Sequence, residues 1–311
     1  MSRLRTALEE YLALRRKLGF KLCRAGNLLH NFVSFAEQEG ASFITKELAL
    51  RWAIQPKDCQ PAWWAARLGM VRRFTEYWSA VDPRTEIPPQ ELLPHRYHRK
   101  LPYIYSNDEI TKLVKVAQKL PSPKGLRAAT YSTLFGLLAV TGMRVSEPIG
   151  LDRQDVDLAQ GILTVRQTKF GKSRLVPIHP STQEALQRYA NLQDRLFRRP
   201  KTRSFFLSER GTRLTQWTVR RTFVLLSRQI GLRGPEDRHG PRLHDLRHGF
   251  AIQTLLGWYR TDIDIERHMP ELSTYLGHAH VTDTYWYISA APELLRYATL
   301  RLEHKEGGKL S

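Results

Sequence analysis

The sequence predicts a mainly α-helical chain with one small β-hairpin or sheet, divided into a helical N-terminal domain and a larger α+β domain. Three observations support this fold class. Apolar residues recur at helical spacing through residues 3–38 and 61–78. Five prolines lie within residues 82–102, where regular structure cannot continue for long. Residues 162–167 and 174–178 have strand-like patterns on either side of a basic, glycine-containing turn, which is typical of a β-hairpin.

The charge of the chain indicates the class of its partner. The 311 residues include 49 Lys and Arg against 30 Asp and Glu, so the formal net charge is +19. Residues 1–92 carry +4 of this charge and residues 93–311 carry the remaining +15. Such an excess is typical of proteins that neutralise nucleic-acid phosphates. We therefore expect a nucleic-acid partner, with most of the excess charge on the C-terminal part.

Composition also restricts the compartment. No apolar run approaches the roughly 18 residues that a membrane span needs, and the charged N-terminus is unlike a secretion signal. The two cysteines, Cys23 and Cys59, are too few for a disulfide framework and lack metal-ligand spacing. We expect a cytoplasmic, nucleoid-associated protein with no metal, no cofactor and no membrane contact.

The N-terminal domain is expected at residues 1–92. Residues 3–38 predict two amphipathic helices interrupted at Gly19 and Gly26, Thr45 can cap a third helix, and Pro61 can open a fourth. Several basic side chains could face a nucleic acid, although a solvated helix face explains any single cluster as well. These are Arg15, Arg16, Lys17, Arg67, Arg72 and Arg73.

The C-terminal domain is expected at residues 103–311, after a linker at 93–102. Ser106 and Glu109 have the spacing of a capping box at a helix start, and Ser181 and Glu184 repeat that spacing. A mostly apolar helix is expected at about 125–140, and Phe205 to Leu207 suggest a short strand. Further helices are expected from Thr215, His244, Ile265 and Pro292, the last forming a C-terminal tail.

Three segments of this domain carry residues suited to phosphate chemistry. Arg144 follows Thr141-Gly142 at the end of the apolar helix, where packing can fix a planar guanidinium. His244 and Arg247 stand three positions apart at a helix start, which places both on one face. Tyr287 lies nine residues beyond His278. Together these side chains supply cations, proton carriers and a nucleophile for covalent cleavage of a phosphodiester.

These motifs resemble the tyrosine recombinase, or phage integrase, family in order and spacing. The resemblance lies in Arg144, Lys169, His244-x-x-Arg247, Leu276-Gly277-His278 and Tyr287. It covers residues 103–300, and TDTYWYISAAPELL resembles a transposon-associated branch. The resemblance implies a catalytic domain at 103–311, and in outline a core-binding (SAM-like) DNA-binding domain at 1–92. It further implies double-stranded DNA as the partner and a tetramer on paired DNA sites, with other recombinases as further partners to test.

The resemblance also implies a role for each site residue. Arg144 and Arg247 would clamp the scissile phosphate, His244 and His278 would assist with hydrogen bonds and protons, and Tyr287 would be the nucleophile. Lys169, at the hairpin tip, would be the general acid. Glu147 would support the site without taking part in the chemistry. The product of cleavage would be a 3′-phosphotyrosyl link, formed without metal or ATP.

Neighbouring residues of the same types and other functions offer alternatives to these assignments. Tyr285 and Lys172 lie next to the assigned nucleophile and acid, and His248 and His280 are expected to be structural or solvent-facing. Rival functions are a type IB topoisomerase, a non-catalytic DNA-binding architectural protein and a metal-dependent nuclease. The chain retains all the matching residues, which disfavours the architectural protein. It lacks a convincing Asp/Glu cluster beside the histidines, which disfavours the nuclease.

Overall fold

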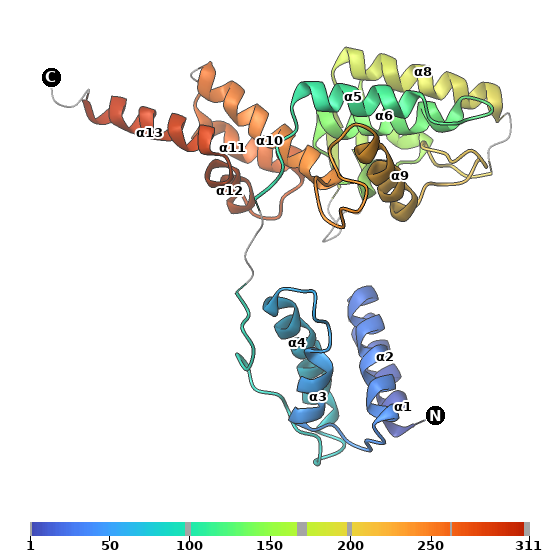
Figure 1. Ribbon diagram of the computed structural model, residues 1–311, viewed down its shortest axis with the longest axis vertical. Helices are drawn as coiled ribbons and strands as arrows, with labels where there is room; N and C mark the ends of the chain where they lie inside the picture. Colours follow the sequence, from blue (N-terminus) through green and yellow to red (C-terminus); the bar gives the residue numbers. More distant parts are fainter. Residues whose placement is uncertain (1, 97–100, 167–172, 198–200, 262, 308–311) are drawn as a thin grey trace. The chain divides into compact units, whose positions relative to one another are not determined.

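The computed structural model describes residues 2–96, 101–166, 173–197, 201–261 and 263–307, with side chains as far as Leu300. The chain divides into two compact units, Met1–Lys100 and Leu101–Ser311. Both are mainly helical (Figure 1), and the second unit also contains a small antiparallel sheet.

The first unit is a helical bundle. Its helices are α1 (Arg3–Lys17), α2 (Cys23–Gln38), α3 (Lys46–Ala53) and α4 (Pro61–Trp78). They enclose a core that includes Leu8, Phe32, Trp52 and Phe74. The Thr45 hydroxyl accepts a hydrogen bond from the Leu48 backbone N–H at 3.1 Å, so the predicted cap of α3 is confirmed.

Two expectations for this unit are wrong. Gly26 does not interrupt a helix, because it lies buried inside α2, where an added Cβ would come within 3.7 Å of Leu12. Arg67 does not face a partner. Its guanidinium is buried over the Trp52 ring, 3.7 Å from the ring centre, and donates to the Trp52 carbonyl at 2.7 Å. The pattern of basic residues did not separate this core arginine from the surface ones.

The second unit begins with helices that pack around a large core. They are α5 (Asn107–Gln118), α6 (Leu126–Thr141), α7 (Ser146–Gly150), the 3-10 helix η1 (Arg153–Asp155), α8 (Pro180–Leu196) and α9 (Gln216–Gln229). The capping box at the start of α5 is confirmed, since Ser106 and Glu109 bond each other's backbone N–H groups at 3.1 and 2.8 Å. Helix α6 lies against both α5 and α8 (Figure 1).

The sheet contains β1 (Val156–Asp157), β2 (Ile162–Val165) and β3 (Arg174–Pro177) in the order β1-β2-β3. The predicted hairpin is confirmed as the β2 and β3 pair, in which Val165 lies opposite Arg174. Strand β1 was not predicted, because two residues are too few to show alternation. The hairpin turn, with Lys169 and Lys172, lies outside the described residues.

Two further local expectations are wrong. Helix α8 starts at Pro180, and the His179 ring accepts from the Ser181 N–H, so Ser181 and Glu184 do not form its capping box. Proline suits the first helical position because it has no N–H to satisfy there, and it moves the helix start upstream. Phe205 to Leu207 do not form a strand, since only isolated bridges from Ser204 to Asp152 and from Leu207 to Arg213 occur there.

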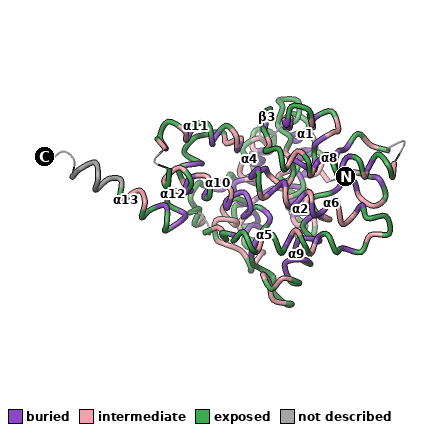
Figure 2. The backbone as a smooth tube through the Cα atoms, turned by 90° about the horizontal axis from the view of Figure 1, so that it is seen from above, coloured by how far each residue is buried: buried purple, intermediate pink, exposed green. Residues whose placement is uncertain are grey.

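The last helices build a separate core that carries the site. They are α10 (Leu243–Arg260), α11 (Ile265–Leu276), α12 (Thr282–Ala290) and α13 (Pro292–Gly307). Buried positions run along α10 as far as Leu256 (Figure 2). Helix α13 packs Leu294 and Tyr297 against this core, and its C-terminal part extends away from the unit (Figure 1). Helix α12 was not predicted as a separate element.

Candidate active site

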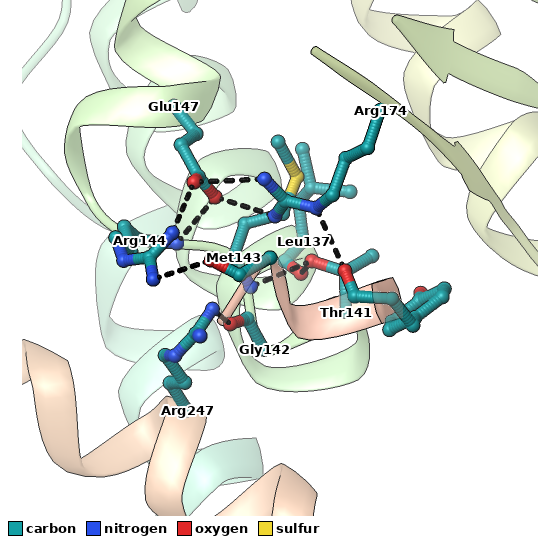
Figure 3. A network of polar contacts seen from close by, with 10 residues as sticks. Leu137, Thr141, Gly142, Met143, Arg144, Glu147, Arg174 and Arg247 are labelled. Carbon is teal, nitrogen blue, oxygen red and sulfur yellow. Dashed lines mark hydrogen bonds and ion pairs between the residues drawn. The ribbon is translucent and has the colours of Figure 1, made fainter. Parts of the chain in front are cut away.

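The turn after α6 places Arg144. Gly142 ends α6 with φ +60°, and an added Cβ would lie 2.6 Å from the Phe250 ring, so both backbone and space require glycine. Two residues later, the Arg144 guanidinium donates to Glu147 Oε1 at 3.0 Å and to the Gly277 carbonyl at 2.8 Å. Arg144 therefore connects the start of α7 to the turn after α11 (Figure 3).

Arg174 on β3 is a site residue that the sequence did not single out. Its guanidinium makes two hydrogen bonds to the Glu147 carboxylate, at 2.9 and 2.8 Å, and donates through Nε to the Tyr275 carbonyl at 2.7 Å. Figure 3 shows Glu147 between the two arginines. Burial alone would raise the pKa of Glu147, but the bonds and charge of Arg174, helped by Arg144, hold it below its ordinary value. Glu147 therefore stays ionised and fixes both cations.

The turn after α11 brings His278 to the same place. Gly277 has φ +71°, and an added Cβ would lie 2.8 Å from Nη1 of Arg174. This close approach explains the glycine within Leu276-Gly277-His278. The ring of His278 then bonds Thr284 Oγ1 through Nδ1 at 2.7 Å, which fixes its orientation.

Arg247 on α10 is the most buried arginine of the site, with 2% of its surface exposed. Its Nη1 donates to the Gly142 carbonyl at 2.9 Å, whereas its buried Nη2 has no hydrogen-bond partner among the described residues. Burial lowers the pKa of Arg247 to about 10, and the charge of Arg144 adds to this effect. An unsatisfied buried guanidinium nitrogen is costly, so this donor calls for an anion.

His244 lies in the first turn of α10, three residues before Arg247. Its side chain keeps an exposed surface, yet packing of the ring and the charges of Arg247 and Arg242 lower its pKa to about 4. It is therefore neutral at pH 7 and can donate or accept a hydrogen bond. His244 and Arg247 lie on the same face of α10 because residues three positions apart in a helix are neighbours on its surface.

Tyr287 on α12 is 1% exposed and lies within the core formed by α10 to α13. Its ring centre is 6.1 Å from that of His278, and it interacts electrostatically with Arg247. The neighbouring Tyr285 is 43% exposed. The structure thus brings Tyr287 close to Arg247 and His278, two of the residues that the sequence singled out, whereas Tyr285 faces solvent.

Two other histidines, His248 and His280, were expected to be structural or solvent-facing, and they differ in burial. His280 is exposed. His248 is not solvent-facing: it is 4% exposed, and its Nδ1 lies 3.3 Å from the Tyr287 hydroxyl. It stands four residues after His244, and the two ring centres are 4.7 Å apart. Its position four residues after His244 in a helix was the sequence signal from which its place beside the site could have been predicted.

The described residues contain no group of three or more His, Cys, Asp or Glu side chains that could hold a metal ion. No helix in the described part of the chain is both long and apolar enough to span a membrane.

A mainly helical domain with a three-stranded sheet and a cluster of arginines, histidines and one buried tyrosine is typical of enzymes that break and rejoin phosphodiesters through tyrosine. The comparison with known proteins gives the family. The chain belongs to the phage integrase family, whose model matches residues 104–293.

Relatives extend this similarity beyond the matched segment. The chain is 48% identical over 309 residues to a protein of Sinorhizobium fredii named as the integrase/recombinase y4rB, and the match covers 98% of each chain. It is 29% identical to the tyrosine recombinase XerC of Herpetosiphon aurantiacus, over 89% of this chain and 87% of the relative. Both relatives are named as recombinases, and the chain is a tyrosine recombinase.

Solved structures share the fold. The Tn1549 transposon integrase in complex with transposon right end DNA matches with a TM-score of 0.63 at 16% identity, covering 96% of this chain and 98% of that one. A lambda integrase tetramer bound to a Holliday junction matches with a TM-score of 0.55 at 20% identity, covering 90% and 78%. At these identities, the likeness supports the fold class that the sequence predicts.

Proposed function

We propose that the protein cleaves and rejoins DNA strands through a 3′-phosphotyrosyl link to Tyr287, in integration, excision or transposition. The observation that carries this proposal is the position of the Arg247 Nη2 donor, which is buried, lacks a partner among the described residues and belongs to a cation that interacts with Tyr287. A phosphate placed there would satisfy the donor and meet the nucleophile.

Arg144 and Arg247 act as the clamp on the scissile phosphate. Both guanidiniums are anchored at one end, Arg144 to Glu147 and Gly277, and Arg247 to Gly142. Anchoring in advance means that little reorganisation is needed when charge develops on the non-bridging oxygens, which is how such cations lower a barrier. Glu147 and Arg174 hold the clamp in position and do not touch the phosphate.

Proton transfer completes the cycle. His244, neutral at pH 7, and His278, oriented by Thr284, assist as hydrogen-bond partners of the phosphate and its oxygens. Lys169 is the general acid that protonates the departing 5′ oxygen, an assignment that rests on the family motif. The bond to Tyr287 keeps the energy of the phosphodiester, so rejoining needs neither metal nor ATP.

The partner is double-stranded DNA, and the working assembly is a tetramer on two paired sites, with other recombinases as additional subunits where an element requires them. The net charge of +19 supports the DNA partner. The lambda integrase tetramer on a Holliday junction and the Tn1549 integrase on transposon right end DNA support the assembly by analogy of fold. We place the helical unit at 1–92 on DNA as the core-binding domain, and the protein in the cytoplasm at the nucleoid.

The decisive experiment traps the covalent intermediate. A DNA site is first selected by the wild-type protein from a random-sequence pool, and a nicked duplex carrying that site then serves as a suicide substrate. We expect a denaturant-resistant adduct from wild type and from Tyr285→Phe, and none from Tyr287→Phe, with DNA binding equal in all three. Peptide mapping should locate the nucleotide on Tyr287, and a junction at Tyr285 would overturn the assignment.

The same assay separates the rival functions. Adduct formation should persist after exhaustive chelation, because arginines occupy the role that Mg²⁺ has in two-metal nucleases. Loss of cleavage in EDTA, restored by Mg²⁺, would favour the nuclease. Relaxation of a supercoiled plasmid without the selected site would favour the topoisomerase, and binding with no adduct would favour the architectural protein.

A further inference from the structure

The buried histidine beside the nucleophile has no role in the chemistry described so far. His248 and Tyr287 are 4% and 1% exposed, and both lie away from water between α10 and α12. A buried phenol hydroxyl needs a hydrogen-bond partner, and His248 Nδ1 lies 3.3 Å from the Tyr287 oxygen. This distance is long for such a bond, as catalytic contacts often are before substrate binds.

Three aromatic rings pack around the His248 ring and restrict its orientation. Its ring centre is 4.7 Å from that of His244, 5.5 Å from that of Trp286 and 5.5 Å from that of Tyr287. His278 lies against the Tyr287 ring with an interplanar angle of 23° and directs its own Nδ1 to Thr284. His248 thus places a ring nitrogen, Nδ1, beside the Tyr287 hydroxyl.

The chemistry of cleavage requires a proton acceptor at this hydroxyl. Free tyrosine has a pKa near 10, so the phenol carries its proton at pH 7 and must lose it on attack. An adjacent base is the usual means of activating a hydroxyl nucleophile. Arg144, Arg247 and the lysine acid stabilise anions or give protons, so a neutral histidine is the group suited to accept the phenolic proton, and His248 places Nδ1 3.3 Å from the phenol oxygen.

We propose that His248 orients the Tyr287 hydroxyl and accepts its proton during DNA cleavage, a role that rests on the proposed function of Tyr287. His248 acts in its neutral form, with Nδ1 unprotonated. The bond between Tyr287 Oη and phosphorus forms, the bond from phosphorus to the 5′ oxygen breaks, and the phenolic proton passes to Nδ1. A second proton, from the general acid, passes to the departing 5′ oxygen. Rejoining runs the same transfers in reverse.

The test uses an acidic phenol to bypass the base. A ring-fluorinated tyrosine at position 287 ionises at lower pH and needs less help to lose its proton. Single-turnover adduct formation on the nicked selected site is measured with protein in excess, for wild type, His248→Ala and His248→Asn, each with ordinary or fluorinated tyrosine. Asparagine keeps a polar atom near the position of Nδ1 but cannot take up the proton. The exposed His280→Ala is the matched control.

With ordinary tyrosine, His248→Ala and His248→Asn should both form adduct about 100-fold or more slowly, within the range that proton-transfer catalysis supplies. Fluorination should restore most of the rate in both variants and change wild type little. His280→Ala should match wild type. All variants should bind the selected site equally, and His248→Asn, which better preserves side-chain volume, keeps the comparison possible if the alanine variant unfolds.

Three results would overturn the role of His248. They are an unchanged rate in both variants, an equal defect with either tyrosine, or full recovery of the ordinary-tyrosine rate by asparagine alone, which would mean that only the position of the hydroxyl matters. Failure of the proposed function is distinct, because then wild type itself would give no adduct at Tyr287.

Discussion

Arg174 holds the Glu147 carboxylate with two hydrogen bonds, at 2.9 and 2.8 Å, and the same carboxylate binds Arg144 at 3.0 Å. The arginine proposed to clamp the phosphate is thus positioned by a carboxylate that a second, non-clamping arginine keeps ionised. Side-chain exposures of 9% for Arg174 and 5% for Glu147 make this a buried ion pair. Loss of Arg174 would leave the buried carboxylate compensated by Arg144 alone.

The first prediction concerns the stability of this pair. Arg174→Met should destabilise the fold by about 3–5 kcal/mol at pH 7, the usual cost of breaking a buried pair. The exposed Arg153, paired with Asp194, offers a control in which Arg153→Met should cost about 0–1 kcal/mol. Urea unfolding of both variants measures the difference. Equal costs would show that Glu147 does not depend on Arg174.

The pH dependence of that cost has a definite sign. Because the folded pKa of Glu147 lies below its ordinary value, the stabilisation is present above the unfolded pKa and is lost as pH falls through the folded pKa. The destabilisation by Arg174→Met should therefore shrink when unfolding is measured at progressively acidic pH. A destabilisation that grows on acidification would contradict the assigned direction of the shift.

The second prediction tests the turn before His278. Gly277→Ala places a methyl group 2.8 Å from Arg174 Nη1 at a φ of +71°, so it should destabilise the fold by more than about 1 kcal/mol. It should also slow adduct formation, because the Gly277 carbonyl anchors Arg144. Gly136→Ala inside α6, where nothing lies within 4 Å, is the control and should be neutral or stabilising by up to about 1 kcal/mol.

The third prediction concerns Lys169 as the general acid. Removing the acid should slow cleavage by roughly 10²–10⁴ on normal DNA. Because a thiolate leaves without a proton, Lys169→Ala should recover most of its rate on DNA with sulfur at the 5′-bridging position. Arg144→Ala should recover much less, since it stabilises non-bridging oxygens. Rescue of Lys172→Ala instead would reassign the acid.

The fourth prediction concerns the tail helix. Leu294 is buried in the core of its own unit, whereas Leu295 and Leu300 are exposed on α13. If α13 docks on a neighbouring subunit, the double change Leu295→Ser and Leu300→Ser should spare binding to a single site and abolish synapsis of two sites in a gel shift. Leu294→Ala should instead lower stability by about 2–5 kcal/mol. Unchanged synapsis in the double variant would exclude this surface.

The motifs of the sequence were enough to predict the fold class and the residues that lie around Arg247. They succeeded because short helical spacings fix which side chains share a face, as for His244 and Arg247. They did not identify Arg174, whose partners Glu147 and Tyr275 lie 27 and 101 residues away and have no local pattern. They did not connect His248 with Tyr287, because this contact joins two helices that only tertiary packing brings together. The assigned catalytic roles stay predictions.

The three arginines of the site all donate to carbonyls in distant parts of the chain: Arg144 across 133 residues, Arg247 across 105 and Arg174 across 101. Contacts of such long range form late in folding, because the intervening loop must close first. During synthesis, Tyr275 and Gly277, whose carbonyls bind Arg174 and Arg144, are added only after about four-fifths of the second unit has been made. A chain that stops before Tyr275 therefore lacks the two carbonyls that hold Arg174 and Arg144, and it also lacks the proposed nucleophile Tyr287, so the site can assemble only in a chain made almost to its end.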